Sequence, residues 1–284
     1  MEYIQKQRIV TCSNELIDKL RSNEILSKEE YLYLIQNRSF CSNYLFKNAE
    51  EVRTINYGNE IYIRGLIEFS NYCKNDCLYC GIRRSNTNIE RYRLSKNEIL
   101  VCCEYGFNLG FRTFVLQAGE DGFYSDNDFY EIIKEIKKRF QDCAITLSLG
   151  ERSFESYKKM KDAGADRYLL RHETCNQEHY EKLHPKEMSF ENRIRCLNDL
   201  KVIGYQIGAG FMVGSPYQTE DNLADELIFL KKLNPHMVGI GPFISHKDTP
   251  FRDEKTGTAE LTIFMLGLIR LSRSEGTRLN SVTG

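Results

Sequence analysis

From residue 61 onward, short apolar runs alternate along the chain with longer amphipathic stretches. The apolar runs are typical of buried β-strands, and they cover residues 61–70, 113–117, 144–149, 167–170, 206–213 and 236–243. The amphipathic stretches predict helices over residues 95–109, 127–139, 153–163, 189–203 and 219–233. Strands that alternate with helices favour one parallel sheet whose connections are right-handed crossovers.

The first 56 residues have a different pattern, which predicts helices without strands. Apolar residues recur near helical spacing at Tyr31, Leu34 and Ile35, and Ser27 precedes them with Glu30 three residues later. This pairing of serine and glutamate matches a capping box, which marks the start of a helix. We therefore expect an N-terminal helical extension over residues 1–56.

We expect the strands and helices to form an α/β fold, a TIM-type (β/α) barrel, because the residues that look chemically active follow directly after strands. A doubly wound open sheet is the alternative. It is less favoured because the turn after the first strand carries cysteines where a dinucleotide-binding fold has a glycine-rich phosphate loop. The short motif Gly239-Ile240-Gly241 is followed by Pro242 and opens no clear helix.

Composition and charge narrow the class of protein. Hydrophobic residues make up 41% of the 284 residues and charged residues 28%, as in globular proteins. The 39 Lys and Arg against 40 Asp and Glu give a formal net charge of −1, so no basic excess indicates a nucleic-acid partner. No apolar run approaches the roughly 18–20 residues that span a bilayer, so no membrane partner is expected. The first 20 residues are too polar for a secretory signal, which predicts a cytoplasmic protein.

Three of the ten cysteines form the most informative motif in the chain. Cys73, Cys77 and Cys80 have the spacing C-x3-C-x2-C in the loop that follows the first predicted strand. A reducing cytoplasm disfavours disulfides, so clustered cysteines indicate metal or redox chemistry. Thiolates hold iron–sulfur clusters, and three of them would leave one iron of a four-iron cubane open for another ligand.

A structural zinc site is the alternative for these thiols. Zinc usually takes four closed ligands that come as two separated pairs. No second pair is present, because Cys102 and Cys103 are adjacent and the other cysteines stand alone. The spacing therefore favours a cluster over zinc.

The motif resembles the signature of the radical S-adenosylmethionine (radical SAM) superfamily, with Tyr79 as the aromatic residue before the last cysteine. Seven blocks in order resemble the HydE-type maturases of [FeFe]-hydrogenase: IEFSNYCKNDCLYCGIRR, VLQAGED, TLSLGE, ADRYLLRHET, SFENR, GAGFMVG and MVGIGPFISHKDTP. Biotin synthase and methylornithine synthase share the broader pattern but resemble these blocks less.

The resemblance implies a [4Fe–4S] cluster held by the three cysteines, with SAM chelated at its fourth iron. One electron would cleave SAM to methionine and a 5′-deoxyadenosyl radical, which takes hydrogen from a small-molecule substrate. The implied role is maturation of the hydrogenase cofactor, and the implied partners are a low-potential electron donor and other hydrogenase maturation proteins. Another biotin-synthase-like enzyme, or a catalytically impaired relative that binds cluster and SAM, is the alternative.

The same resemblance assigns residues to SAM. Gly119 and Glu120 correspond to the stretch whose backbone meets the SAM amino group, where glycine allows close approach. Arg193 would clamp the methionine carboxylate, and Glu173 would contact the ammonium group or the ribose. Without the resemblance, Arg193 reads as an ordinary surface arginine.

Five further positions are assigned on the same basis. Tyr79 belongs to the cofactor site, Met212 lies beside the ribose and adenine, and Ile240 is on the strand that backs the adenine. By itself, Met212 would be read as core packing. Arg171 and Thr146 would face the substrate.

The chain also departs from the family pattern. Ala118 replaces a serine, and Tyr217 replaces a glycine at a turn where a positive φ would strain it. His179 and His184 are five residues apart, and we expect both on the surface.

The resemblance stops after Leu271. We therefore expect a C-terminally truncated relative, with an incomplete barrel of about six strand–helix units over residues 57–271 and a divergent tail over 272–284. An unpaired strand edge and an open apolar lumen predict weak stability or aggregation.

Overall fold

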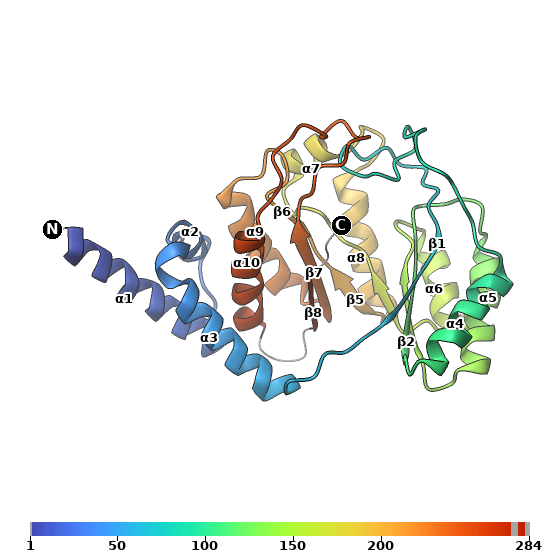
Figure 1. Cartoon of the computed structure of the whole chain (residues 1–284), viewed down its shortest axis with the longest axis horizontal. Helices are drawn as coiled ribbons and strands as arrows, with labels where there is room; N and C mark the ends of the chain where they lie inside the picture. The colour runs from blue at the N-terminus through green and yellow to red at the C-terminus, as the bar shows by residue number, and fades with distance from the viewer. Residues whose placement is uncertain (1, 274–277, 282–284) are drawn as a thin grey trace.

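The computed structural model describes residues 2–273 and 278–281 (Figure 1). Three helices form the N-terminal region: α1 (Glu2–Arg21), α2 (Lys28–Gln36) and α3 (Arg38–Tyr57). The predicted capping box is confirmed, because Ser27 Oγ accepts from the Glu30 amide at 3.3 Å and Glu30 Oε2 accepts from the Ser27 amide at 2.8 Å.

The N-terminal helices pack on the end of the barrel that carries α9 (Glu220–Leu233) and α10 (Ala259–Ser272). Figure 1 shows α2 and α3 beside these two helices and α1 projecting away from the body. Lys28 pairs with Asp225 at 2.9 Å, and Arg38 pairs with Glu220 at 2.9 Å. The division of the chain into domains at residues 56 and 271 stays a prediction.

A parallel sheet forms the centre of the molecule. Its strands are β1 (Gly65–Ser70), β2 (Thr113–Ala118), β3 (Ala144–Ser148), β4 (Arg167–Leu169), β5 (Gln206–Ala209), β6 (Met212–Val213), β7 (Met237–Pro242) and β8 (Arg278–Ser281). The described strands follow the order β1-β2-β3-β4-β5-β7, β8 pairs with β7, and β6 is a short extension on β7. The remaining helices are α4 (Lys96–Asn108), α5 (Asp126–Arg139), α6 (Phe154–Ala163), α7 (Gln177–Leu183) and α8 (Phe190–Ile203).

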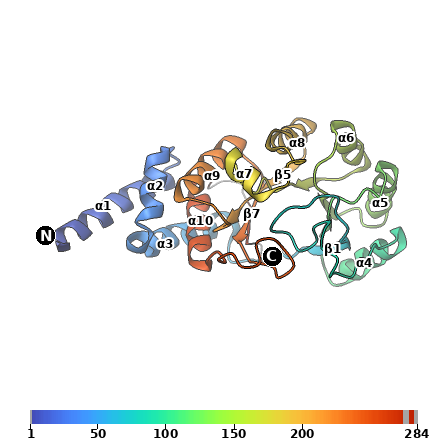
Figure 2. The ribbon, with the colours of Figure 1, turned by 90° about the horizontal axis from the view of Figure 1, so that it is seen from above.

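The sheet curves into a partial barrel with the helices on its outer side, as the view from above shows (Figure 2). The predicted α/β fold and the incomplete barrel are therefore confirmed. Along the outer edge of β1, one antiparallel bridge between Ser70 and Arg93 covers the end of the strand. Leu66, on the same strand, remains 55% exposed. The weak stability that we expect from such an edge stays a prediction.

Two sequence predictions about the strands are wrong. The run 206–213 is divided into β5 and β6, and the count of six strands omits β8 in the tail. The sequence of β8, RLNS, is short and has no apolar alternation, so backbone pairing with β7 and not side-chain pattern defines it. Helices α7 and α10 were also missed.

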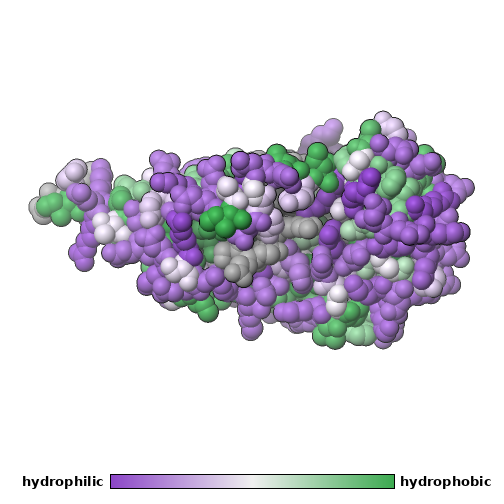
Figure 3. All heavy atoms as spheres, turned by 90° about the horizontal axis from the view of Figure 1, so that it is seen from below, coloured by the Kyte–Doolittle hydropathy of each residue, from purple (hydrophilic) through white to green (hydrophobic). Residues whose placement is uncertain are grey.

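Buried side chains between the sheet and the helices form the core. Phe114 and Leu116 on β2 and Ile145 and Leu147 on β3 are at most 1% exposed. On the underside, apolar atoms appear in separate groups among hydrophilic ones (Figure 3). Among the described residues, no helix combines the length and apolarity needed to cross a membrane.

The break between β5 and β6 depends on Gly210. A Cβ atom at this position would lie 1.8 Å from the backbone oxygen of Gly239 on β7. The Gly210 carbonyl accepts from the Glu173 amide at 3.0 Å, and its own amide donates to His172 Nδ1 at 3.2 Å. The close approach of two backbones therefore also positions the loop after β4.

We expect Gly210→Ala to lower the free energy of unfolding by about 3 kcal/mol or more, because rigid backbone cannot move away from the added methyl group. Gly122→Ala is the matched control, since nothing lies within 4 Å of a Cβ atom there. Urea denaturation of both variants measures the difference. Equal stability of the two variants would contradict the close packing at Gly210.

Candidate active site

The carboxyl ends of the parallel strands meet at one edge of the sheet, and the loops that follow them converge there. The loop after β1 carries the three cysteines, and the loops after β2, β3 and β4 carry Glu120, Glu151 and Arg171. Parallel strands thus bring together residues that are far apart in the sequence.

The cysteine loop is shaped by side chains other than its thiols. Asp76 accepts from Arg83 Nε at 2.7 Å and from the hydroxyl and the amide of Ser85 at 2.6 and 3.0 Å. The Arg91 guanidinium donates to four carbonyls of the loop, those of residues 71, 82, 83 and 86. The loop therefore has a defined shape with its thiols left for ligation.

All three cysteines are free thiols of intermediate exposure. Burial raises the pKa of Cys80 to about 11, and it raises the pKa values of Cys73 and Cys77 as well. Cys77 Sγ lies 3.6 Å from Met188 Sδ, in the segment after α7. Binding of iron would displace the thiol protons, as thiolate ligation requires.

Gly119 brings the loop after β2 against the cysteine loop. A Cβ atom at Gly119 would lie 2.4 Å from the Tyr72 carbonyl oxygen and 2.7 Å from Cys73 Cβ. The Lys74 amide donates to the Glu120 carbonyl at 3.0 Å. The structure therefore brings Gly119 and Glu120 together with the cysteine loop, and their assignment to the SAM amino group stays a prediction.

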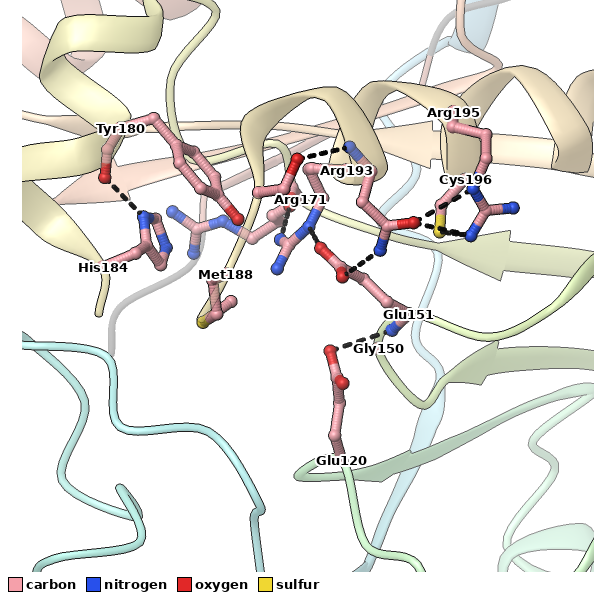
Figure 4. A network of polar contacts seen from close by, with 12 residues as sticks. Glu120, Gly150, Glu151, Arg171, Tyr180, His184, Met188, Arg193, Arg195 and Cys196 are labelled. Atoms are coloured by element: carbon pink, nitrogen blue, oxygen red, sulfur yellow. Dashed lines mark hydrogen bonds and ion pairs between the residues drawn. The ribbon is translucent and has the colours of Figure 1, made fainter. Parts of the chain in front are cut away.

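A polar network joins the loops after β2, β3 and β4 (Figure 4). Glu120 Oε1 accepts from the Glu151 amide at 2.9 Å, and Glu151 Oε1 accepts from Arg193 Nε at 2.5 Å. Arg193 Nη1 donates to the Arg171 carbonyl at 2.5 Å. Arg193 is only 7% exposed, so the alternative reading of it as a surface arginine is wrong. Sequence reasoning missed Glu151, although an acidic residue directly after a strand was a usable signal.

Successive side chains in the segment after β4 have different partners. Arg171 Nη2 and Glu173 Oε2 lie 3.2 Å apart, and Glu173 adopts a φ of 65°, which is uncommon for a residue with a side chain. His172 is fully buried, and its Nε2 lies 2.7 Å from Glu226 Oε2 on α9. Because His172 Nδ1 accepts from the Gly210 amide, its Nε2 carries the hydrogen and donates to Glu226.

Several buried polar atoms of the site have no hydrogen-bond partner in the protein. They are Thr146 Oγ1, Arg171 Nε and Nη2, Glu173 Oε2 and Tyr180 Oη, of which Arg171 Nη2 and Glu173 Oε2 form an ion pair at 3.2 Å without a hydrogen bond. Buried polar groups are normally hydrogen-bonded, so those of Arg171, Glu173 and Tyr180 indicate groups that a ligand satisfies. The thiols fit an iron–sulfur cluster. The guanidinium and the carboxylate fit the amino-acid end of SAM.

Met212 and Ile240 contribute apolar surface of different kinds. Met212 is 7% exposed and packs in a small cluster with Leu183, Phe243 and Phe251, which Leu78 and Tyr79 border. It thus lies beside the cysteine loop. Ile240 is fully buried in the main core, apart from the small cluster that contains Met212.

The prediction that His179 and His184 lie on the surface is wrong, because they are 2% and 4% exposed. Helix α7 carries His179 and ends beside His184, and both rings are covered by other segments. His184 Nδ1 donates to the Tyr180 carbonyl at 2.9 Å, so its Nε2 accepts from the Tyr79 hydroxyl at 3.1 Å. Tyr217 has a φ of 65°, the strained conformation that we expected there.

Among the residues that the structure describes, no group of three or more His, Cys, Asp or Glu side chains converges as a single metal ion would require. A cubane makes a different demand, because each thiolate binds a different iron.

A model of the family described as "Radical SAM superfamily" matches residues 67–230. The chain belongs to the radical SAM superfamily. It is 49% identical to the [FeFe] hydrogenase maturase subunit HydE of Thermotoga maritima over 257 residues. The aligned segment covers 90% of this chain and 73% of that protein. It is 31% identical to 3-methylornithine synthase of Methanosarcina acetivorans, over 80% of this chain and 64% of that one.

Solved structures of this superfamily share the fold. A crystal structure of methylornithine synthase matches 94% of this chain and 85% of its own, with a TM-score of 0.79 and 25% identity. The hydrogenase maturase HydG matches 97% of this chain and 64% of its own, with a TM-score of 0.82 and 23% identity, which shows the fold alone. As a radical SAM protein, the chain is an enzyme that uses a [4Fe–4S] cluster and SAM and acts on a small molecule.

We expect Glu151→Gln to lower the free energy of unfolding by about 3 kcal/mol, because the buried Arg193 guanidinium loses its counter-charge. Asp199→Asn is the control, on the helix α8 that also carries Arg193. The ion pair of Asp199 with Arg195 is partly exposed and contributes no more than about 0.5 kcal/mol. Urea denaturation at pH 7.5 compares them. A loss no larger in Glu151→Gln than in the control would contradict the role of the buried pair.

We also expect the metal-free protein to lose stability in acid through His184, whose pKa burial lowers to about 3. In the unfolded chain, His184 takes up a proton near pH 6.5. The contribution of neutral His184 to the free energy of unfolding is therefore fully present above that pH and is lost as the pH drops toward 3. The slope of the unfolding free energy between pH 5.5 and 4 should be shallower in His184→Gln, by up to about 1.4 kcal/mol per pH unit. Measurements at pH 7.5 give the packing cost separately, and identical slopes would refute the assignment.

Proposed function

We propose that this chain is a radical SAM enzyme that acts in assembling the active-site cofactor of [FeFe]-hydrogenase, as its HydE relative is named for doing. The observation that carries the proposal is 49% identity to HydE over 90% of this chain. The site supports it, because three thiols, a buried arginine and unpaired polar atoms gather at the carboxyl ends of the strands.

Cys73, Cys77 and Cys80 would hold the cluster, with its fourth iron left for SAM. When bound, cluster and SAM together supply reductive cleavage of SAM. The protein orients these groups and keeps water away from them. Met212 and Tyr79 supply the apolar surface beside the cysteine loop, and Ile240 backs it from the core.

Arg193 and Arg171 have different roles in binding anions. Arg193 already donates from Nε to Glu151 and from Nη1 to the Arg171 carbonyl, so it holds the loops and contributes only its remaining donors. Arg171 Nε has no hydrogen-bond partner, whereas Nη2 is ion-paired with Glu173 Oε2 at 3.2 Å. Arg171 thus has the donors for a carboxylate, and Thr146 Oγ1 is a further free group for the substrate.

Gly119, Glu120 and Glu173 would bind the amino end of SAM. The Gly119 backbone reaches the cysteine loop because it has no side chain, and Glu120 and Glu173 place carboxylates near the thiols. Glu173 Oε2 is ion-paired with Arg171 Nη2 but accepts no hydrogen bond in the protein, so it has the capacity to accept one from an ammonium or a hydroxyl group.

We further propose a low-potential electron donor and other hydrogenase maturation proteins as partners, and a cytoplasmic location. The electron donor follows from reductive cleavage, which consumes one electron. Ten free cysteines suit a reducing compartment.

An enzyme of the methylornithine synthase or biotin synthase kind is the second candidate. It is supported by 31% identity to 3-methylornithine synthase and by the match to a solved methylornithine synthase with a TM-score of 0.79. A test of hydrogenase maturation separates the two candidates.

Anaerobic reconstitution with iron and sulfide should give a cluster whose electron paramagnetic resonance signal changes when SAM is added. The signal should be lost in Cys77→Ala and retained in Cys102→Ala, an exposed cysteine outside the loop. With dithionite, loaded protein should release 5′-deoxyadenosine. An unchanged signal in Cys77→Ala, or one zinc and no iron per chain, would overturn the cluster assignment.

A maturation mixture that lacks only HydE tests the biological role. Added wild-type chain should restore hydrogenase activity at least tenfold over the mixture without it, whereas Cys77→Ala should not. If SAM is cleaved but no hydrogenase activity returns, the second candidate is favoured.

A further inference from the structure

Tyr180 on α7 carries a buried hydroxyl that the fold itself does not use. The residue is 0% exposed, and its Oη has no hydrogen-bond partner. Other buried tyrosines differ: Tyr168 Oη donates to the Gly150 carbonyl at 2.9 Å, and Tyr205 Oη donates to the Tyr157 carbonyl at 2.8 Å. Tyr180 is the one tyrosine in the described part of the chain with a buried, unpartnered hydroxyl.

Packing fixes the direction of this hydroxyl. The Tyr180 ring stacks on His184 with centroids 3.9 Å apart and meets Phe190 edge-on at 5.7 Å. His184 is itself held between the Tyr180 carbonyl and the Tyr79 hydroxyl. Because the ring cannot turn without breaking these contacts, the hydroxyl stays aimed where the structure places it.

The hydroxyl points toward the polar network of the site. Figure 4 shows the Tyr180 side chain directed at Arg171 and Arg193. The charges of Arg193, Glu151, Cys77 and Glu173 all act on the Tyr180 hydroxyl. Burial raises the pKa of Tyr180, so the hydroxyl keeps its proton and remains a donor.

The surrounding groups select the kind of ligand atom that the hydroxyl can meet. Two guanidinium groups lie on this side, and each has a carboxylate partner, since Arg193 pairs with Glu151 and Arg171 Nη2 pairs with Glu173. Arg171 Nε has no hydrogen-bond partner. The Tyr180 hydroxyl and Arg171 Nε are both donors, so together they favour an acceptor group such as a carboxylate. SAM has one anionic group, its carboxylate, while its ammonium and sulfonium groups are cations.

We propose that the Tyr180 hydroxyl donates a hydrogen bond to the carboxylate of bound SAM, beside Arg171. This inference rests on the proposed function and deepens it, since it adds a SAM-binding residue from a helix that the sequence pattern did not predict. A carboxylate oxygen there would give the Tyr180 hydroxyl the acceptor that the protein does not supply.

Stability of the metal-free protein gives the first test. Tyr180→Phe removes only the unpartnered hydroxyl, so its urea midpoint should equal or exceed that of the wild type. Tyr205→Phe is the matched control and should be less stable, because it leaves the Tyr157 carbonyl unpaired. A Tyr180→Phe protein less stable than Tyr205→Phe would show a structural role and overturn the inference.

Ligand affinity gives the second test, by anaerobic equilibrium dialysis of cluster-loaded protein with SAM and with decarboxylated SAM. Tyr180→Phe should bind SAM about tenfold more weakly or worse than wild type, and Tyr205→Phe should bind it equally well. Decarboxylated SAM should bind wild type and Tyr180→Phe alike.

Unchanged SAM affinity in Tyr180→Phe, or equal weakening for both ligands, would overturn the inference while the proposed function stands. Loaded wild-type protein that binds no SAM at all would instead remove the proposed function, and the inference with it.

Discussion

A charged group that is buried away from water must be paired with an opposite charge or hydrogen-bonded. This requirement determines how the loops at the carboxyl ends of the strands are arranged. Glu151 after β3 pairs with Arg193 on α8, and Glu226 on α9 accepts from His172 after β4. Each pair joins two elements that are distant in the sequence, so the loops are fixed relative to one another. Arg171 is ion-paired with Glu173 through Nη2, and its Nε has no hydrogen-bond partner in the protein.

Much of the fold could be predicted from periodicity, since parallel strands buried on both faces read as apolar runs and their helices read as amphipathic ones. The failures have local causes. After Gln206 the run 207–213 has no polar side chain to mark its break, which lies where Gly210 approaches the Gly239 backbone. The strand β8 is defined by pairing with β7, which no pattern within RLNS reveals.

The site was predictable to the extent that its signals are local. Three cysteines within eight residues are a local signal, and a resemblance could extend it to Gly119, Glu173 and Arg193. The partner of Arg193 was not predictable, because Glu151 lies 42 residues earlier and meets it only in space. The misreading of His184 has a related origin: its ring stacks on Tyr180 of α7, and its other nitrogen meets Tyr79 of the cysteine loop, which is distant in the sequence.

The way in which Asp76 and Arg91 hold the cysteine loop has a consequence for how long the enzyme lasts. Their hydrogen bonds go to backbone groups, the Ser85 hydroxyl and the Arg83 guanidinium and not to the thiols, so the shape of the loop does not depend on its sulfur atoms. If oxygen strips the cluster, we expect the loop to keep the shape that accepts a new one. Such a chain would not have to be synthesised again after each loss of its cluster.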